Sequence, residues 1–211
     1  MKYLFLLIFI GTFSSCNEIE SKTTLESASQ KFADGNYEAA KQEMFEFFKI
    51  DPKNKDNITA LTILGHIYEA LDEDKKAQTA YQKVLKINPN RVEAITGLGI
   101  LARKQNDYEK AVEYYERAIR IEPDYAQAVS SLSVVHLLRR DFEQAVSIGE
   151  KALKLDAEDP VILSNLTIAA YYLQDSIKLE QHYQRLKKTG YRQMEGLDRI
   201  LSGETTLFPN D

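Results

Sequence analysis

Apolar residues recur at spacings of three and four along most of the chain, which is typical of helices that bury one face. These segments come in pairs, and three successive pairs begin 34 residues apart, at Ile58, Val92 and Ala126. Within each pair a leucine is followed by a small residue, and an alanine stands thirteen positions after that leucine. Small residues let two helices approach closely, so the pattern predicts a repeated helix-turn-helix unit.

Two further features support this interpretation of the three clear repeats. Pro89 and Pro123 follow the second helix of their repeats, where a missing N–H and a restricted preceding residue end a helix. Larger residues such as Tyr81 and Tyr115 are expected to fill the space around the close contacts. The small positions of the three repeats are Gly65, Ala77, Val84, Gly99, Ala111, Ala118, Ser133, Ala145 and Ala152.

The period and its small positions resemble the tetratricopeptide repeat, a helix-turn-helix unit of about 34 residues. The resemblance implies an all-α, right-handed solenoid of about five repeats with a C-terminal capping helix. The expected array covers 24–190, with repeats at 24–52, 58–91, 92–125, 126–159 and 160–190. Residues 191–211 are expected to form the capping helix, over 192–201, and a frayed tail, because repeat arrays need a covered end.

The resemblance also implies a concave groove, lined by the first helix of each repeat, that binds segments of other proteins. Some relatives clamp chaperone carboxyl termini with Lys, Asn and Arg, but Ile63, Glu93 and Gly97 hold the corresponding positions here. We therefore expect a protein or peptide partner with an uncharged or apolar segment. The alternative is that Ile100, Val134 and Tyr172 pack against neighbouring repeats. The groove residues carried over are Thr62, His66, Thr96, Ile100, Arg103, Ser130, Val134, Asn165, Ile168 and Tyr172.

The amino terminus carries a second resemblance. An apolar run at 3–13 follows Lys2 and precedes Ser14, Ser15 and Cys16, the only cysteine of the chain. The run is too short to span a membrane, and its flanks are typical of a secretion signal. The segment resembles the lipobox of bacterial lipoproteins, with Phe13 where Leu is usual. The resemblance implies a signal peptide at 1–15, palmitate-type acylation of Cys16 and a polar tether over 16–23. The alternatives are an ordinary signal peptide with a free thiol, or an uncleaved anchor.

Together the two resemblances predict a membrane-anchored scaffold or adapter in the bacterial envelope that assists the assembly of a complex. Asn17 does not match the aspartate that retains some lipoproteins at the inner membrane, so we expect the outer membrane, facing the periplasm. Such lipoproteins resemble, in architecture, tetratricopeptide factors for pilus secretin and outer-membrane protein assembly. The alternative is a regulatory, non-catalytic subunit of a cell-wall or polysaccharide enzyme.

Charge and motifs disfavour other functions. The chain has 27 Lys plus Arg against 32 Asp plus Glu, mixed along its length, which argues against nucleic acid as a partner. His66, His136 and His182 lie far apart without an HExxH pair or a cysteine partner, and no GxSxG or phosphate-binding motif occurs. We therefore expect no catalysis, metal, cofactor or small-molecule substrate. His136 is expected in the inter-helix core, and His66 is the better functional candidate.

Overall fold

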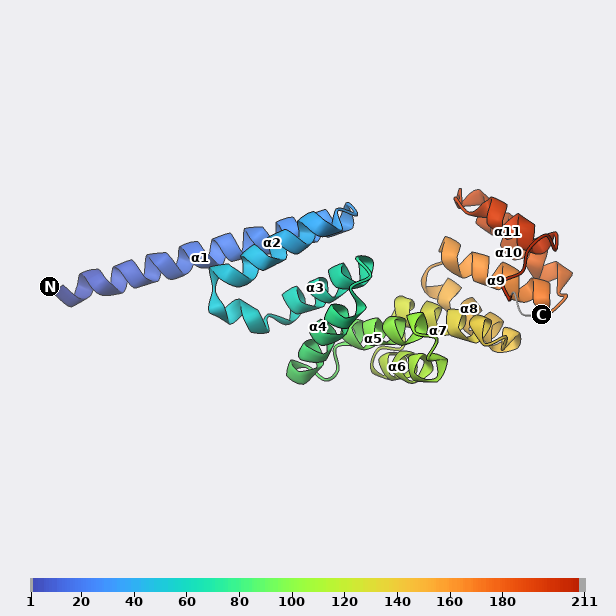
Figure 1. The fold of residues 1–211 in the computed structure, drawn as a ribbon, viewed down its shortest axis with the longest axis horizontal. Coiled ribbons are helices and arrows are strands. Elements are labelled where there is room, and N and C mark those ends of the chain that lie inside the picture. Colours follow the sequence, from blue (N-terminus) through green and yellow to red (C-terminus); the bar gives the residue numbers. More distant parts are fainter. Residues whose placement is uncertain (1, 209–211) are drawn as a thin grey trace. The chain divides into compact units, whose positions relative to one another are not determined.

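The computed structural model describes the backbone of residues 2–208 and the side chains of residues 18–51 and 53–208. Over this part of the chain every regular element is helical, so the predicted all-α class is confirmed (Figure 1). In chain order the elements are α1 (Lys2–Ala33), α2 (Tyr37–Ile50), the 3-10 helix η1 (Pro52–Asp56), α3 (Ile58–Ala70), α4 (Asp74–Ile87), α5 (Val92–Lys104), α6 (Tyr108–Ile121), α7 (Ala126–Leu138), α8 (Phe142–Leu155), α9 (Pro160–Tyr172), α10 (Ser176–Lys188) and α11 (Met194–Leu201).

The helices form two compact units, Met1–Leu101 and Ala102–Asp211. In the first unit α1 packs against α2, α2 against α3, and α3 against α4. In the second unit the contacts run in the same way from α6 to α10, and α11 covers α9. Each helix therefore buries its apolar face mainly against its neighbours in the sequence, as the repeat pattern requires.

The same turn joins the two helices of each pair. A residue with positive φ ends the first helix, and the next N–H donates to the carbonyl five residues before it, as from Glu73 to Tyr68 at 2.8 Å. This Schellman ending suits glycine, and asparagine tolerates it, whereas larger side chains are strained there. The residues with positive φ at these turns are Gly35, Asp72, Asn106, Arg140 and Gln174.

The ring of Tyr81 in α4 joins three helices of the first unit. Tyr81 is 0% exposed and lies between Gly65 of α3 and Gly97 of α5. A β-carbon at Gly65 would stand 2.4 Å from ring atom Cε1, and one at Gly97 would stand 2.4 Å from Cε2 and Cζ. Because real β-carbons do not approach so closely, only glycine fits on either side of the ring.

The amino-terminal helix corrects the expected tether. Residues 16–23 belong to α1, so eight residues there span about 12 Å instead of the 26–29 Å of an extended chain. No proline interrupts this segment, and the hydroxyls of Thr23 and Thr24 donate to carbonyls one turn earlier. Ser21 Oγ also accepts a hydrogen bond from Asn54 Nδ2 at 3.2 Å, which holds α1 to η1. The segment is therefore helical and held by η1 where polarity alone suggested an extended tether.

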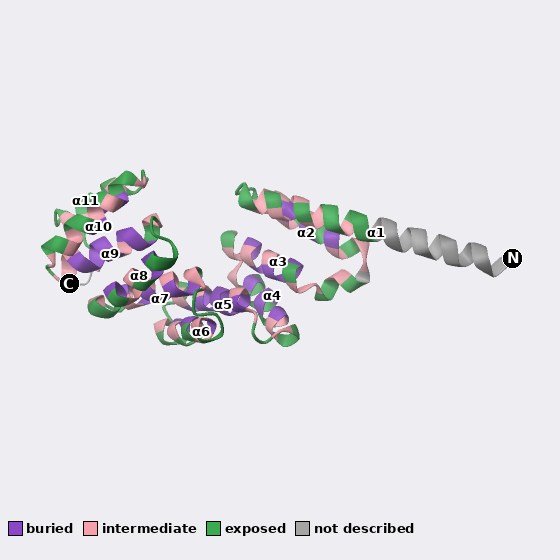
Figure 2. Ribbon diagram, turned by 180° about the vertical axis from the view of Figure 1, so that it is seen from behind, coloured by how far each residue is buried: buried purple, intermediate pink, exposed green. Residues whose placement is uncertain are grey.

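The core of the second unit is a cluster of buried residues that comes from α7, α8, α9, α10 and α11, and Figure 2 colours buried residues purple. Leu163 and Leu166 of α9 and Leu186 of α10 are fully buried there. The Ser133 hydroxyl donates to the carbonyl of Ala145 at 2.8 Å, so this small residue both admits the neighbouring helix and bonds to it. The small positions thus serve close helix contact in both units.

The end of the chain differs from the expected frayed tail. Helix α11 covers the array through Leu197, which is 3% exposed. After α11 the chain returns to α9, where Thr206 Oγ1 lies 3.0 Å from Tyr172 Oη and Leu207 packs against the core. The prediction of fraying is therefore wrong for 205–208, because apolar side chains there find uncovered apolar surface.

Candidate functional site

Four of the predicted groove residues lie in the first unit, on α3 and α5. His66 and Ile100 are half-buried, but Thr62 and Thr96 are only 4% and 1% exposed. The Thr62 hydroxyl donates to the carbonyl of Ile58 in its own helix at 2.7 Å. Neither threonine presents its side chain at a surface. The expectation of an open groove position is wrong for these two residues.

His66 is part of a hydrogen-bonded cluster rather than an isolated surface group. Tyr81 Oη lies 2.8 Å from His66 Nδ1 and donates to Glu69 Oε2 at 2.9 Å. Because the phenol has one proton and the carboxylate only accepts, His66 donates from Nδ1 to the phenol oxygen. Burial lowers the pKa of His66, and the Glu93 carboxylate opposes that shift. The imidazole therefore holds Tyr81 in place in its neutral form.

The other six groove residues lie in the second unit. Arg103, Ser130, Val134 and Asn165 are half-buried, whereas Ile168 is 7% exposed and belongs to the core. Tyr172 stacks on Phe142, with ring centroids 4.9 Å apart and an interplanar angle of 4°. Ile168 is thus corrected to a core residue, and the alternative interpretation of Tyr172, packing within the chain, is the one observed.

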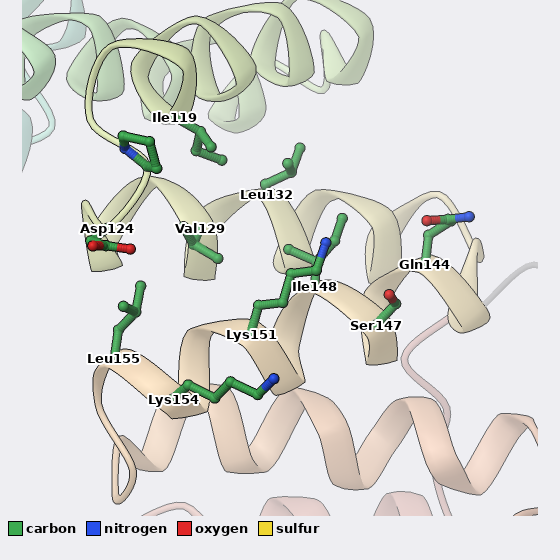
Figure 3. A pocket seen from close by; sticks show the side chains of 11 residues that line it. Ile119, Asp124, Val129, Leu132, Gln144, Ser147, Ile148, Lys151, Lys154 and Leu155 are labelled. Atoms are coloured by element: carbon green, nitrogen blue, oxygen red, sulfur yellow. The ribbon is translucent and has the colours of Figure 1, made fainter.

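A pocket that the sequence analysis did not predict lies among α6, α7 and α8 of the second unit (Figure 3). Its volume is about 510 Å³. The apolar part of its lining comes from all three helices and the turn before α7, and comprises Ile119, Pro123, Val129, Leu132, Ile148 and Leu155. Pockets of this size commonly hold ligands or anchor side chains of a partner.

The edge of this pocket is positively charged. Lys151 and Lys154 stand one turn apart on α8, are exposed and line the pocket together with Ser147 and a single acid, Asp124 (Figure 3). Neither lysine forms an ion pair within the part of the chain that the structure describes. The nearby acid Glu150 instead pairs with Lys178 of α10 at 2.7 Å. The pocket therefore combines an apolar floor with two cationic groups available to a partner.

Sequence reasoning missed this pocket because it assigned recognition to the first helices. The available signal was Ile148 and Leu155 on α8, which interrupt an otherwise polar outer face, next to two lysines. Leu155 is 39% exposed, but Ile87 and Ile121, which end α4 and α6, are 43% and 39% exposed, so this exposure alone does not mark a site. Only the packing of α6, α7 and α8 brings these side chains next to Ile119 and Val129.

The remaining histidines are structural. His136 is half-buried, with Nδ1 3.4 Å from Asp141 Oδ2, so it lies nearer the surface than the expected inter-helix core. His182 is 6% exposed, and neither ring nitrogen has a hydrogen-bond partner among the described residues. Burial lowers the pKa of His182. Within the described part of the chain, no three His, Cys, Asp or Glu residues come together as a metal site.

The lipidation site and the signal peptide, Cys16 and 1–15, lie outside the residues whose side chains are described. Their assignment stays a prediction from the sequence. Among the residues that the structure does describe, no helix is sufficiently long and apolar to cross a membrane.

Comparison with known proteins identifies the repeats. Two family models, both described as tetratricopeptide repeat, match residues 58–124 and 96–160. No curated protein matches the sequence. The matches overlap and together cover the three clear repeats.

Solved structures share the fold at low sequence identity. PilF of Pseudomonas aeruginosa superposes with a TM-score of 0.73 and 20% identity, over 89% of this chain and 85% of PilF. A thermophilic tetratricopeptide-repeat protein of Thermus thermophilus gives 0.70 and 18%, over 87% of this chain and 97% of its own. YrrB, a tetratricopeptide-repeat protein described as having an unusual peptide-binding site, gives 0.56 and 16%, over 82% and 90%. Residues 58–160 are therefore tetratricopeptide repeats, and the helix pairs on either side of them extend the same all-α fold.

Proposed function

We propose that the chain is a lipid-anchored scaffold of the bacterial envelope that binds a segment of a partner protein in the pocket among α6, α7 and α8. The pocket is the observation that carries the proposal, since it places two exposed lysines beside an apolar floor that three helices build together. The likeness to YrrB adds support, because that protein is described as having an unusual peptide-binding site. Tetratricopeptide repeats bind proteins or peptides, and the finer assignment rests on this chain's own residues.

The chemistry of the pocket selects a partner segment with both apolar and acidic side chains. Burying one aliphatic side chain against Ile119, Val129 and Ile148 contributes about 1.5–3 kcal/mol. Lys151 and Lys154 would then attract carboxylates beside that side chain and fix the register of the segment. The uncharged or apolar segment predicted from the sequence would bind a different surface, the first-helix groove at Ser130, Val134 and Asn165.

The proposed anchor is a lipid on Cys16, supported by the lipobox resemblance of residues 13–16. Several acyl chains on one residue would hold the chain firmly, because each buried CH₂ contributes about 0.8 kcal/mol. The expected site is the outer membrane, facing the periplasm, where the scaffold would assist assembly of an envelope complex. If the chain instead regulates an envelope enzyme, it would use the same pocket. The two roles then differ only in which protein is bound.

Site-specific photo-crosslinking in the host cell tests the proposal. One probe replaces Ser147 in the pocket, a second replaces Val134 on the first-helix side, and a control replaces exposed Glu113 of α6, away from the pocket. We expect one discrete protein adduct from position 147. An adduct from position 134 alone would refute the pocket and support the groove, and equal results from all three positions would refute both surfaces.

Charge reversal sharpens the same experiment. Lys151→Glu combined with Lys154→Glu should abolish the adduct from position 147. The matched control, Lys187→Glu with Lys188→Glu, makes the same change in net charge at exposed positions of α10 and should leave the adduct intact. Equal loss in both variants would mean that overall charge, rather than the pocket, governs binding.

A further inference from the structure

The segment after α11 folds back onto the second unit and places an aromatic ring among three side chains. The Phe208 ring lies 5.2 Å from the ring of Tyr172 and 6.0 Å from that of Phe142. The guanidinium carbon of Arg140 lies 4.5 Å from the centre of the Phe208 ring. We call Arg140, Phe142 and Tyr172 the aromatic seat.

One residue of the seat belongs to the repeat pattern, since Phe142 begins α8 as Tyr37 and Tyr108 begin α2 and α6, whereas Arg140 is not a residue that the pattern requires. Arg140 has a φ of +65° at a turn where the equivalent residues include Gly35 and Asn106, which tolerate this conformation better. Its strained backbone carries the guanidinium onto a ring face, where a cation is attracted to the aromatic electrons. Phe142 and Tyr172 come from different helix pairs and stack in parallel beside it.

The occupant of the seat is recognised by a short local pattern. Thr206 Oγ1 pairs with Tyr172 Oη at 3.0 Å and also accepts a hydrogen bond from the Phe208 N–H at 3.0 Å. A hydroxyl two residues before a phenylalanine therefore both sets the turn and positions the ring. Leu207 between them contacts the core at its edge.

The backbone of residues 205–208 forms little hydrogen bonding with the rest of the second unit. Its described backbone bond to the rest of the unit runs from the Thr205 N–H to the carbonyl of Arg199 at 3.1 Å. Thr206 is exposed and Phe208 is half-buried. Segments with few buried contacts open at low free energy, so an equivalent segment from another chain can replace this one.

We propose that the aromatic seat is a second docking site, for an extended partner segment with threonine or serine two residues before phenylalanine, and that 205–208 occupies it as a built-in competitor. This inference shares with the proposed function only the idea that the chain binds protein segments. The seat itself is separate from the lysine-edged pocket. Because a tethered segment acts at an effective concentration of roughly millimolar, a partner must bind more tightly than the free segment does.

The test uses a fluorescein-labelled peptide of residues 202–211, SGETTLFPND, and the full chain. Fluorescence anisotropy should show at least ten-fold tighter binding to the Phe208→Ala chain than to the wild type, because the variant empties the seat. A peptide carrying the same Phe208→Ala change should bind the variant chain at least ten-fold more weakly. Equal binding to both chains would overturn the proposal.

Further variants test whether the peptide binds at the seat itself. In the Phe208→Ala chain, adding Phe142→Ala should abolish peptide binding, whereas Phe45→Ala, at an exposed position of α2, should not change it. Lys151→Glu should also leave it unchanged, so failure of the pocket and failure of the seat are distinguishable. A Phe208→Ala chain that melts at a lower temperature yet binds no peptide would show that 205–208 is only part of the cap, and would refute the docking site.

Discussion

Replacing Gly97 by alanine sets two physical effects of opposite sign against each other. Gly97 lies inside α5, and glycine in a helix interior costs about 1 kcal/mol relative to alanine. Local propensity therefore predicts that Gly97→Ala stabilises the chain. The structure predicts the reverse, because the new β-carbon would stand 2.4 Å from two ring carbons of Tyr81.

The magnitude follows from how little the ring can move. Relief of the clash needs a shift of about 1 Å, since ordinary carbon contacts begin at 3.4 Å. Moving away from Gly97 drives the ring toward Gly65, whose position is as close, and breaks the bonds of Tyr81 Oη to His66 and Glu69. Overpacking of this kind costs about 1–3 kcal/mol. We expect the upper end of that range, about 3 kcal/mol, because the ring is confined on both sides. Subtracting the gain of about 1 kcal/mol in helix propensity leaves a net loss of about 2 kcal/mol in the free energy of unfolding.

Urea unfolding followed by circular dichroism at 222 nm measures the change. Tyr81→Leu provides the matched background, because removing the ring removes the clash, and Gly97→Ala should then stabilise by up to about 1 kcal/mol. Gly196→Ala in α11, where a β-carbon meets nothing within 4 Å, should stabilise in the wild-type chain. If Gly97→Ala raises stability equally with and without the Tyr81 ring, the packing argument is wrong.

Four other predictions concern the buried histidines, one helix turn and the lipid anchor that the sequence suggests. His182→Leu should stabilise the fold by about 1–2 kcal/mol in urea unfolding, because it removes a buried imidazole without hydrogen-bond partners; a loss of stability would show that the ring has a partner. Burial lowers the pKa of His66 and His182 from 6.5, so the unfolded chain takes up protons first. The free energy of unfolding should therefore be highest above pH 6.5 and fall on acidification below it, less steeply in His182→Leu, and a flat profile would contradict this. Gln174→Gly should raise the melting temperature, corresponding to about 0.5–1 kcal/mol, because Gln174 has a φ of +56°; an unchanged melting temperature would mean that the turn carries no strain. Cys16→Ser should abolish labelling of the chain by a palmitate analogue, and labelling that persists in the variant would refute the lipid anchor at Cys16.

The repeat pattern was enough to predict the helix pairs because their determinants are local. Small residues and apolar spacings recur with the period, and α3, α5, α7 and α9 begin at Ile58, Val92, Ala126 and Pro160. The site was predicted less well. The face of a helix that carries Thr62 or Ile168 can be solvent or core, and only the helices packed over it decide which.

The sequence by itself determined that the chain is an all-α repeat protein, since an apolar face of period 3.6 can be buried only against another helix. It also indicated the small position at Gly65, although not the one at Gly97 nor that one tyrosine ring fills the space between them. The tertiary structure alone decided where the surface is. The pocket joins side chains of three helices, and the aromatic seat joins Arg140 to Phe208 across 68 positions of the sequence, so neither leaves a periodic signal. Packing within a helix pair is encoded locally, whereas the gaps that packing leaves open depend on all the side chains around them.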